Sequence, residues 1–405
     1  MPAEPFAPAR LGHVQLRNRI VKAATFEGMS PAGLVSDRLI EFHRRIAAGG
    51  VGLTTVSYVA VSRDGRGAPN EIHIHDAAAD GLARIAAAVH AEGAAISAQL
   101  GHAGPVGTIR KRYLAPSPGR TMAGTKVEQI TTAEIDEVVG QFADGAAMLA
   151  QAGFDAVELH FGHHYLVSAF LSPRWNRRTD DYGGAAASRA RLPVRILRAV
   201  RDATGGRIAV TAKLNMTDGI RHGLQAADSL EIARLLQDEG VLSALELTAG
   251  GSRANQMYMF RGEPPRAEMA AALPGMAGVG FRLAGRALLR DYPYEEAYLL
   301  PLARQFREAL TLPLILLGGI SSLAAIQQAM AEGFDFVAMG RALLREPDLV
   351  TRLAAGEATV GTCTHCNKCI ASIFTGTRCV LDHPEPAQIL TGHTTTGPTG
   401  GAGSG

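Results

Sequence analysis

Three histidines and a tyrosine stand close together in the segment ELHFGHHYL, at positions His160, His163, His164 and Tyr165. Histidines this close can ligate a metal ion, but a zinc or iron site would usually add a carboxylate or a histidine from elsewhere. Alternatively, two neutral imidazoles can donate hydrogen bonds to a substrate oxygen, with Tyr165 as an adjacent proton donor. The residues alone do not decide whether His163 or His164 supplies the second imidazole.

All four cysteines of the chain lie within one short segment, at Cys363, Cys366, Cys369 and Cys379. Their spacing suits a four-thiolate site, which can hold tetrahedral zinc or an iron–sulfur cluster. Cysteines grouped in this way indicate metal binding or redox chemistry in a reducing compartment, not the scattered disulfides of a secreted scaffold. A structural metal clip and unmetallated cysteines both stay open at this point.

Two glycine-containing pairs, Gly318-Gly319 and Gly340-Arg341, have the composition of a phosphate site. Glycine lets backbone N–H groups approach phosphate oxygens, and arginine adds a bidentate charged contact. The alternative is that the glycines only make tight turns. Barrels often bind phosphate with the loops after strands seven and eight, which is where these pairs fall, so we favour the phosphate site.

The pattern of the chain predicts the scaffold that positions these residues. Short apolar runs alternate with longer segments of helical period, and the alternation repeats about eight times. Such alternation implies a parallel sheet, and eight units close most naturally into an α/β protein of the (β/α)8 TIM barrel type, with catalytic groups at the strand ends. A doubly wound open sheet is the alternative, but Gly-x-Gly-x-x-Gly does not follow the first expected strand. The expected strands are 19–25, 51–61, 94–100, 156–161, 208–215, 244–250, 314–320 and 336–340, and the expected helices lie near 37–48, 77–92, 131–152, 188–204, 226–239, 297–310, 321–332 and 347–355.

Two parts of the chain fall outside the eight repeats. Residues 251–296, after the sixth strand, form a long loop insertion, and loops of this length on a barrel are usually lids or interfaces. We expect the barrel to span residues 1–360, followed by a cysteine-containing extension at 361–391. The Gly/Thr-rich residues 392–405 are expected to be disordered.

The composition excludes several classes of protein. Lys and Arg number 40 against 38 Asp and Glu, so the net charge of +2 argues against a nucleic-acid binder. The longest apolar stretch, 312–320, is far shorter than the roughly 18 residues that a membrane span needs. The N-terminus lacks the pattern of a secretory signal. We expect a cytoplasmic homo-oligomer that acts on small molecules and binds neither nucleic acid nor membranes.

The chain resembles the Old Yellow Enzyme family of FMN-dependent ene-reductases from residue 16 to about residue 353. The segment that follows His-x-x-His-x-Tyr, with its FLSP, NRR and DDYGG, is long and highly specific for that family. The likeness is carried by LRNRIVKAAT (16–25), AQLGHAG (98–104), VELHFGHHYLVSAFLSPRWNRRTDDYGG (157–184), LLGGI (316–320) and MGRALLREPDL (339–349).

The resemblance implies that FMN sits at the barrel mouth. Two sets of residues would hold it, one at the pyrimidine edge of the flavin and one at its phosphate. Lys213 replaces an arginine of many relatives and would keep a positive charge near flavin N1 and O2. The first set is the backbone around Ala24 and Thr25 with the side chains of Gln99 and Lys213; the second is Gly318, Gly319, Gly340 and Arg341.

The resemblance also implies a ping-pong reaction with NAD(P)H as the electron donor and an α,β-unsaturated carbonyl compound as the acceptor. NAD(P)H would reduce FMN and leave before the acceptor binds. His160 and His163 would then bind the carbonyl oxygen, and Tyr165 would protonate Cα.

Alternatives within and outside the family remain. The cysteine segment is similar to the one that binds a [4Fe–4S] cluster in the dienoyl-CoA reductase and trimethylamine dehydrogenase branch, although the final gap is longer there. That similarity mildly favours an FMN-dependent amine dehydrogenase or N-demethylase, whereas His-x-x-His-x-Tyr suits carbonyl binding. A flavin-free metal hydrolase with His160 and His163 as ligands is more distant, because it lacks a carboxylate ligand and gives Gln99 and Lys213 no role.

Overall fold

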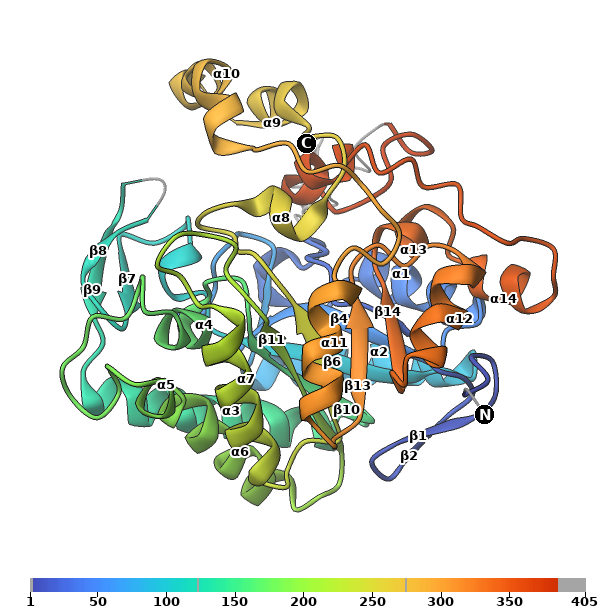
Figure 1. Cartoon of the computed structure of the whole chain (residues 1–405), viewed down its shortest axis with the longest axis horizontal. Coiled ribbons are helices and arrows are strands. Elements are labelled where there is room, and N and C mark those ends of the chain that lie inside the picture. The colour runs from blue at the N-terminus through green and yellow to red at the C-terminus, as the bar shows by residue number, and fades with distance from the viewer. Residues whose placement is uncertain (1–2, 122–123, 274, 385–405) are drawn as a thin grey trace, which may run out of the picture.

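Eight parallel strands form a closed barrel in the computed structural model, which describes residues 3–121, 124–273 and 275–384. The first strand of the barrel pairs with both the second and the last, so the sheet has no open edge there. The (β/α)8 prediction is therefore confirmed, and the doubly wound open sheet is wrong. The barrel strands are β3 (Ile20–Lys22), β4 (Leu53–Ala60), β6 (Ala95–Gly101), β10 (Ala156–Phe161), β11 (Ala209–Asn215), β12 (Ala244–Thr248), β13 (Leu314–Leu317) and β14 (Phe336–Met339) (Figure 1).

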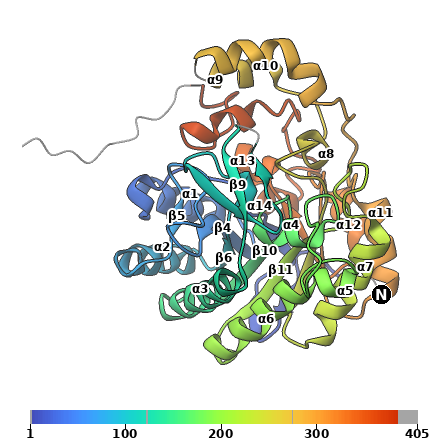
Figure 2. The same cartoon turned by 90° about the vertical axis from the view of Figure 1, so that its left-hand side faces the viewer.

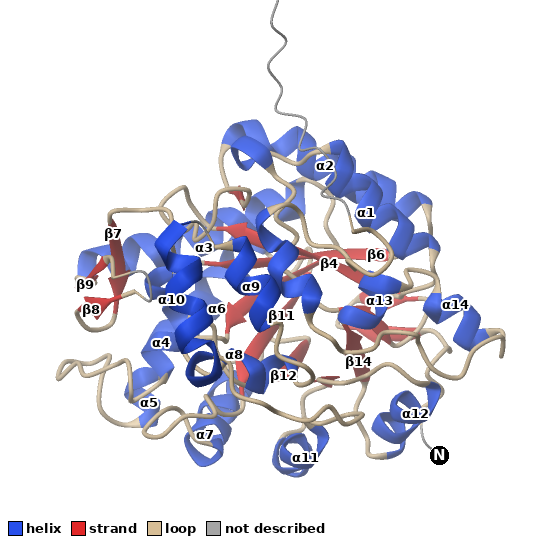
Figure 3. Cartoon of the chain, turned by 90° about the horizontal axis from the view of Figure 1, so that it is seen from above, coloured by secondary structure: helices blue, strands red, loops and turns tan. Residues whose placement is uncertain are grey.

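Helices surround the strands on the outside of the barrel, as the view from above shows (Figure 3). Thr131 and Glu134 form a capping box at the start of the third helix. The helix expected near 347–355 is present as Leu349–Ala354. A short helix that was not expected, Arg341–Arg345, ends before Pro347, which cannot donate a hydrogen bond and restrains the residue before it. The outer helices are α1 (Asp37–Ala48), α2 (Ala79–Ala91), α3 (Thr132–Gln151), α6 (Arg191–Thr204), α7 (Ala226–Asp238), α11 (Leu300–Ala309), α12 (Leu323–Ala331), α13 (Arg341–Arg345) and α14 (Leu349–Ala354).

An N-terminal hairpin closes one end of the barrel. Its two strands, β1 (Ala9–Leu11) and β2 (Val14–Leu16), are joined through Gly12, whose φ of 60° suits glycine. Buried side chains of the hairpin pack against the first residues of the barrel strands, among them Leu53 and Phe336. A functional site therefore has to form at the opposite, carboxyl end of the strands.

Three additions cover that carboxyl end. The insertion after β12 is not a loop, because it folds into α8 (Gln256–Phe260), α9 (Arg266–Ala272) and α10 (Gly275–Leu288), which lie over the barrel (Figures 1 and 2). A small sheet, the cap sheet, precedes α3. The described part of the cysteine extension docks on the loop after β3, where Thr377 N donates to Glu27 O at 2.8 Å. The cap sheet consists of β7 (Arg112–Ala115), β8 (Gly119–Arg120) and β9 (Lys126–Gln129).

The structure does not describe the C-terminal residues, but it does bear on the expectation that the chain has no membrane span. The expected tail at 392–405 and the last residues of the extension lie outside the described residues. None of the described helices is both long and apolar enough to cross a membrane.

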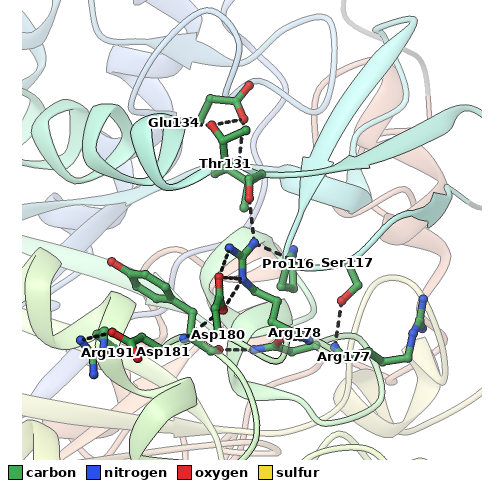
Figure 4. Close-up of polar contacts among 12 residues, drawn as sticks. Pro116, Ser117, Thr131, Glu134, Arg177, Arg178, Asp180, Asp181 and Arg191 are labelled. Atoms are coloured by element: carbon green, nitrogen blue, oxygen red, sulfur yellow. Dashed lines mark hydrogen bonds and ion pairs between the residues drawn. The ribbon is translucent and has the colours of Figure 1, made fainter.

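The segment with the sequence NRR and DDYGG, within residues 176–184, holds the loop after α4 (Leu166–Leu171) to the cap sheet. The Arg178 guanidinium faces Asp180 and also donates to the backbone oxygen of Ile130 at 2.7 Å (Figure 4). Asn176 Nδ2 donates to the backbone oxygens of Phe170 and Tyr182 at 2.8 and 2.7 Å. These side chains are used for structure, and they fix the loop that follows the histidines.

Removing the Arg178 guanidinium should therefore destabilise the protein. Arg178→Ala leaves the Ile130 carbonyl without its charged donor, so we expect the free energy of unfolding to fall by about 2–3 kcal/mol in urea denaturation. The matched control is Arg191→Ala, whose exposed side chain only faces Asp181 at 3.3 Å and should cost less than about 1 kcal/mol. Equal losses in the two variants would contradict this role for Arg178.

Candidate functional site

Register between neighbouring strands sets two pairs of polar side chains inside the barrel, and we call these four side chains the polar layer. Glu158 pairs with Gln99 across β10 and β6, and Lys213 pairs with Glu246 across β11 and β12. Side chains alternate in direction along a strand, so residues of the same register share a layer of the interior. All four side chains are buried.

Lys213 lies at the centre of this layer between two carboxylates. Its Nζ is 3.0 Å from Glu158 Oε1 and 3.0 Å from Glu246 Oε1. Gln99 Nε2 donates to Glu158 Oε1 at 2.5 Å, and Ser57 Oγ donates to Gln99 Oε1 at 3.3 Å. The sequence prediction of Gln99 and Lys213 as neighbours at the strand ends is thus matched by a shared partner, Glu158.

Within this layer Lys213 keeps its positive charge, and Glu246 carries a proton near neutral pH. Burial lowers the pKa of Lys213, but attraction by Glu158 and Glu246 outweighs it and holds that pKa above its ordinary value. Burial raises the pKa of Glu246 to about 8, despite the attraction of Lys213 and with added repulsion from Glu158. Near neutral pH the layer therefore holds an ammonium group and a protonated Glu246.

The two imidazoles of the site come from the end of β10 and the residues after it, and His160 pairs in register with Lys213 on β11. The rings of His160 and His163 are 5.1 Å apart, and the ring of Tyr165 is 4.6 Å from that of His160. His163 Nε2 is 2.9 Å from Thr248 Oγ1, and His163 N donates to Asn215 Oδ1 at 3.1 Å. Nδ1 of His160 is buried and has no partner among the described residues. The structure therefore brings His160, His163 and Tyr165 together.

Burial sets the protonation of these three groups. It lowers the pKa of His160 well below its ordinary value, and the neighbouring His163 and Lys213 act in the same direction. It lowers the pKa of His163 to about 3, again helped by Lys213. It raises the pKa of Tyr165, with Glu71 contributing. Both imidazoles are thus neutral and the phenol keeps its proton, as the proposed hydrogen-bonding role requires.

His164 points into the interior. Its ring is fully buried and lies 5.5 Å from the Trp175 ring, with Nε2 3.3 Å from Asp218 Oδ1. A Cβ at Gly251 would come within 2.2 Å of this ring, so only glycine fits there. Of the two histidines between which the sequence did not decide, His163 is thus the one whose ring lies beside that of His160.

The predicted phosphate residues lie at the ends of β13 and β14. Gly319 has a φ of 78°, and a Cβ there would lie 2.7 Å from Glu295 O, so a turn and a close approach both require glycine. A Cβ at Gly340 would meet only Thr25, at 3.6 Å. Arg341 Nη1 donates to Arg261 O at 3.0 Å. The structure thus places Thr25 beside Gly340, while it binds the Arg341 guanidinium to the backbone of the insertion.

The four cysteines line a single cavity of about 20 Å³, together with Arg341 and Asn367. All four are free thiols. Burial raises the pKa of Cys369 to about 12; Arg341 opposes this, and the three other cysteines add to it. Among the described residues, no three His, Cys, Asp or Glu side chains are arranged to hold a single metal ion. The thiols are therefore gathered, but not around one ion.

The sequence analysis missed several groups of the site. Glu158 and Glu246 lie between apolar residues in the strands AVELHF and ALELT. A carboxylate inside a buried strand is rare unless it has a partner, so these two residues could have been predicted to belong to a site. Thr248 and Asn215, which orient His163, carry no such signal because short polar residues are common at strand ends.

Comparison with known proteins gives the family context. The family described as NADH:flavin oxidoreductase / NADH oxidase matches residues 4–254. The chain is 51% identical over 380 residues to 4,4'-dithiodibutanoate disulfide reductase of Rhodococcus erythropolis, which covers 93% of this chain and 94% of that protein.

Solved structures agree on the fold. An old yellow enzyme homologue from Zymomonas mobilis has a TM-score of 0.70 at 22% identity, covering 90% of this chain and 96% of that one. A 2-naphthoyl-CoA reductase has a TM-score of 0.80 at 24% identity and covers 94% of this chain, which spans only 57% of that protein. The resemblance and the barrel inferred from the sequence are confirmed.

The proton on Glu246 should make stability depend on pH. The folded chain binds this proton more tightly than the unfolded chain, so the unfolding free energy contributed by this group falls as pH rises from about 5 to about 8. The side chain of Glu246→Gln cannot ionise. The Tm of this variant relative to that of the wild type should therefore rise as pH increases across this range. The control Glu357→Gln, at an exposed position, should follow the wild type. Parallel Tm curves for wild type and Glu246→Gln would contradict the assignment.

Proposed function

Because the chain belongs to the NADH:flavin oxidoreductase / NADH oxidase family, and so to the FMN-dependent NAD(P)H oxidoreductases, we propose that it reduces the C=C bond of α,β-unsaturated carbonyl compounds. FMN, when bound, would supply hydride chemistry that links NAD(P)H to the acceptor. The observation that carries the proposal is the pair of neutral imidazoles, 5.1 Å apart, with the Tyr165 ring against one of them. The two imidazoles can donate hydrogen bonds to one carbonyl oxygen, and Tyr165 can protonate one carbon of the same substrate.

The residues at the mouth fit FMN. Among the described residues, two buried polar atoms there have no partner, namely His160 Nδ1 and Glu246 Oε2, and a bound polar group would change their surroundings. At the pyrimidine edge we assign the backbone around Ala24 and Thr25 and the side chains of Gln99 and Lys213. For the phosphate we assign Gly318, Gly319, Gly340 and Arg341.

Lys213 supplies fixed positive charge to the pyrimidine edge. Since its pKa is held above the ordinary value, it keeps this charge throughout the neutral range. The neighbouring carboxyl groups reduce the net positive charge around Lys213. Because Glu246 carries a proton near neutral pH, only Glu158 offsets the charge of Lys213. Lys213 would therefore present a positive charge to the flavin ring of bound FMN, and Glu158 keeps that buried charge from being uncompensated.

His160 and His163 orient and polarise the acceptor. Neutral imidazoles donate hydrogen bonds to a carbonyl oxygen and stabilise the negative charge that develops on it. Thr248 and Asn215 hold His163 in place, so this donor is oriented before the substrate binds. Tyr165, whose pKa is raised, keeps its proton for transfer to Cα.

An organic disulfide is a second candidate acceptor, and the 51% identical disulfide reductase favours it. A hydride and a proton convert one disulfide into two thiols: the hydride breaks the S–S bond, and a proton goes to the leaving sulfur. Tyr165 could supply that proton, and the imidazoles could stabilise the departing thiolate. The compound in that relative's name, 4,4'-dithiodibutanoate, also carries two carboxylates.

Replacing His160 should separate the two half-reactions. His160→Ala removes one donor to the acceptor oxygen, so we expect reoxidation by cyclohex-2-enone to slow by on the order of 100-fold. Reduction of FMN by NADH or NADPH should change little, since it does not need that donor. Rapid-mixing absorbance of the flavin measures both rates, and His13→Ala, exposed on the hairpin at the other end of the barrel, is the control.

The same experiment distinguishes the acceptors. Wild-type enzyme that is reoxidised by the enone but not by 4,4'-dithiodibutanoate supports C=C reduction, and the reverse result supports disulfide reduction. Unchanged enone rates in His160→Ala would contradict the role given to the imidazoles. A protein that does not retain FMN would overturn the whole proposal.

We also propose that the cysteine segment binds a [4Fe–4S] cluster, in which each thiolate would ligate a different iron, and that this cluster clips the extension onto the barrel. Four thiols line one cavity, and burial together with the neighbouring thiols raises the pKa of Cys369. A bound cluster would relieve that mutual repulsion and keep the thiolates deprotonated. Asn367 in this segment also contacts Arg341, which links the extension to the proposed phosphate site.

Metal analysis of protein purified without oxygen tests this centre. A cluster should give about four iron and four sulfide per chain, whereas a zinc clip should give about one zinc. Cys366→Ser should lose most of the metal, and Thr364→Ser, in the same cavity lining, should retain it. Wild-type protein that holds zinc, or neither metal, would contradict the proposal.

A further inference from the structure

Arginines without acidic partners surround the single tryptophan of the chain. Cζ of Arg253 lies 4.0 Å from the centre of the Trp175 ring, and Cζ of Arg174 lies 5.6 Å from it. Arg177 follows two residues after Trp175 in the same loop. We call Arg174, Arg177 and Arg253 the arginine cluster. Within the described part of the chain, none of the three has a carboxylate oxygen within 4.0 Å, whereas nearby Arg178 does.

The cluster uses only part of its hydrogen-bonding capacity. Arg253 Nη2 donates to Arg120 O at 2.9 Å, and Arg177 Nη2 donates to Pro118 O at 3.2 Å. These bonds tie the loop after β12 and the loop after α4 to the cap sheet. Each guanidinium has five N–H donors, so most of them have no backbone partner and can serve an anion.

The electrostatics of the cluster favour an anion. Burial lowers the pKa of Arg253 to about 10, and the positive charges of Arg174 and Arg177 act in the same direction. Three like charges held together without a counter-charge raise the free energy of the folded protein. A carboxylate between them would accept paired hydrogen bonds and offset the repulsion.

The cluster adjoins the histidine loop. His163 forms a β-bridge with Gly251, and Ser252 N donates to His163 O at 3.0 Å. Arg253 follows directly, so its Cα is at most about 7 Å from that of Gly251. From the other side, the buried His164 ring contacts the Trp175 ring. A substrate held at His163 would therefore need only a short chain to reach the cluster.

We propose that the arginine cluster binds a carboxylate of the acceptor, so that the preferred acceptors of this enzyme are carboxylic acids. This rests on the proposed reduction of a small acceptor at His160 and His163, and it names the class of that acceptor. The alternative is that the arginines only stack on Trp175 and bind backbone oxygens.

Kinetics with a matched pair of substrates test the proposal. The pair is (E)-4-oxopent-2-enoate and its methyl ester, which carry the same enone and differ in charge. Arg253→Gln should lower kcat/KM for the acid by about 10–100-fold, the size of a lost charged hydrogen bond, and leave the ester within about twofold. Arg253→Lys should recover part of the loss, and Arg234→Gln, exposed on α7, should behave as wild type. Equal losses for acid and ester would overturn the proposal.

Fluorescence gives a readout that does not need turnover. Trp175 is the only tryptophan, so its emission reports directly on the cluster. Titration of the FMN-loaded enzyme with the acid should change this emission with saturation, and Arg253→Gln should shift the midpoint at least about 10-fold. An equal response to acid and ester, or no shift in Arg253→Gln, would overturn the proposal. Turnover of both compounds with no such preference would leave the proposed function standing, whereas acid binding without turnover of either would refute that function alone.

Discussion

A buried ammonium group sets the main constraint on this barrel. Lys213 is only 1% exposed in the middle of β11, so it needs opposite charge from within the protein. The strands on either side supply it, with Glu158 from β10 and Glu246 from β12. A shift of one residue in either register would turn these carboxylates to the other face of the sheet. The charge therefore fixes the alignment of three neighbouring strands.

The same constraint extends around most of the barrel. A second buried pair joins Lys22 Nζ to Glu27 Oε1 at 2.6 Å, and Glu27 Oε2 accepts from Ser57 N at 2.6 Å. Through Ser57 and Gln99 this pair connects with the carboxylates around Lys213, so polar contacts run across six consecutive barrel strands. A network so completely buried has few alternative arrangements, which keeps the groups at the pyrimidine edge in place before any ligand binds. Its members are Lys22, Glu27, Ser57, Gln99, Glu158, Lys213 and Glu246.

The sequence predicted those features that depend on local pattern. Alternating apolar runs and helical periods are enough to predict the barrel, whereas the pairing of His160 with His163 came only from the resemblance to a known family. The roles of Glu158 and Glu246 depend on register between distant strands, which no local pattern records. The helices of the insertion were missed because Pro and Gly in 251–296 favour loops, although apolar contacts stabilise α8 through Met257. His163 and His164 are adjacent, and only the backbone turn decides which ring faces the site.

The two halves of the site are controlled by different parts of the fold. The groups assigned to FMN lie on barrel strands or their first following residues, where the register of a closed sheet fixes them. The groups that we propose around the acceptor come from additions to the barrel: Trp175 from the loop after α4, Arg253 from the loop after β12, and backbone oxygens of the cap sheet that hold both loops. Loops tolerate substitution more readily than barrel interiors. Membership of the family therefore indicates the electron source of the reaction, while in our proposal the charge and shape of these additions determine which acceptor receives the electrons.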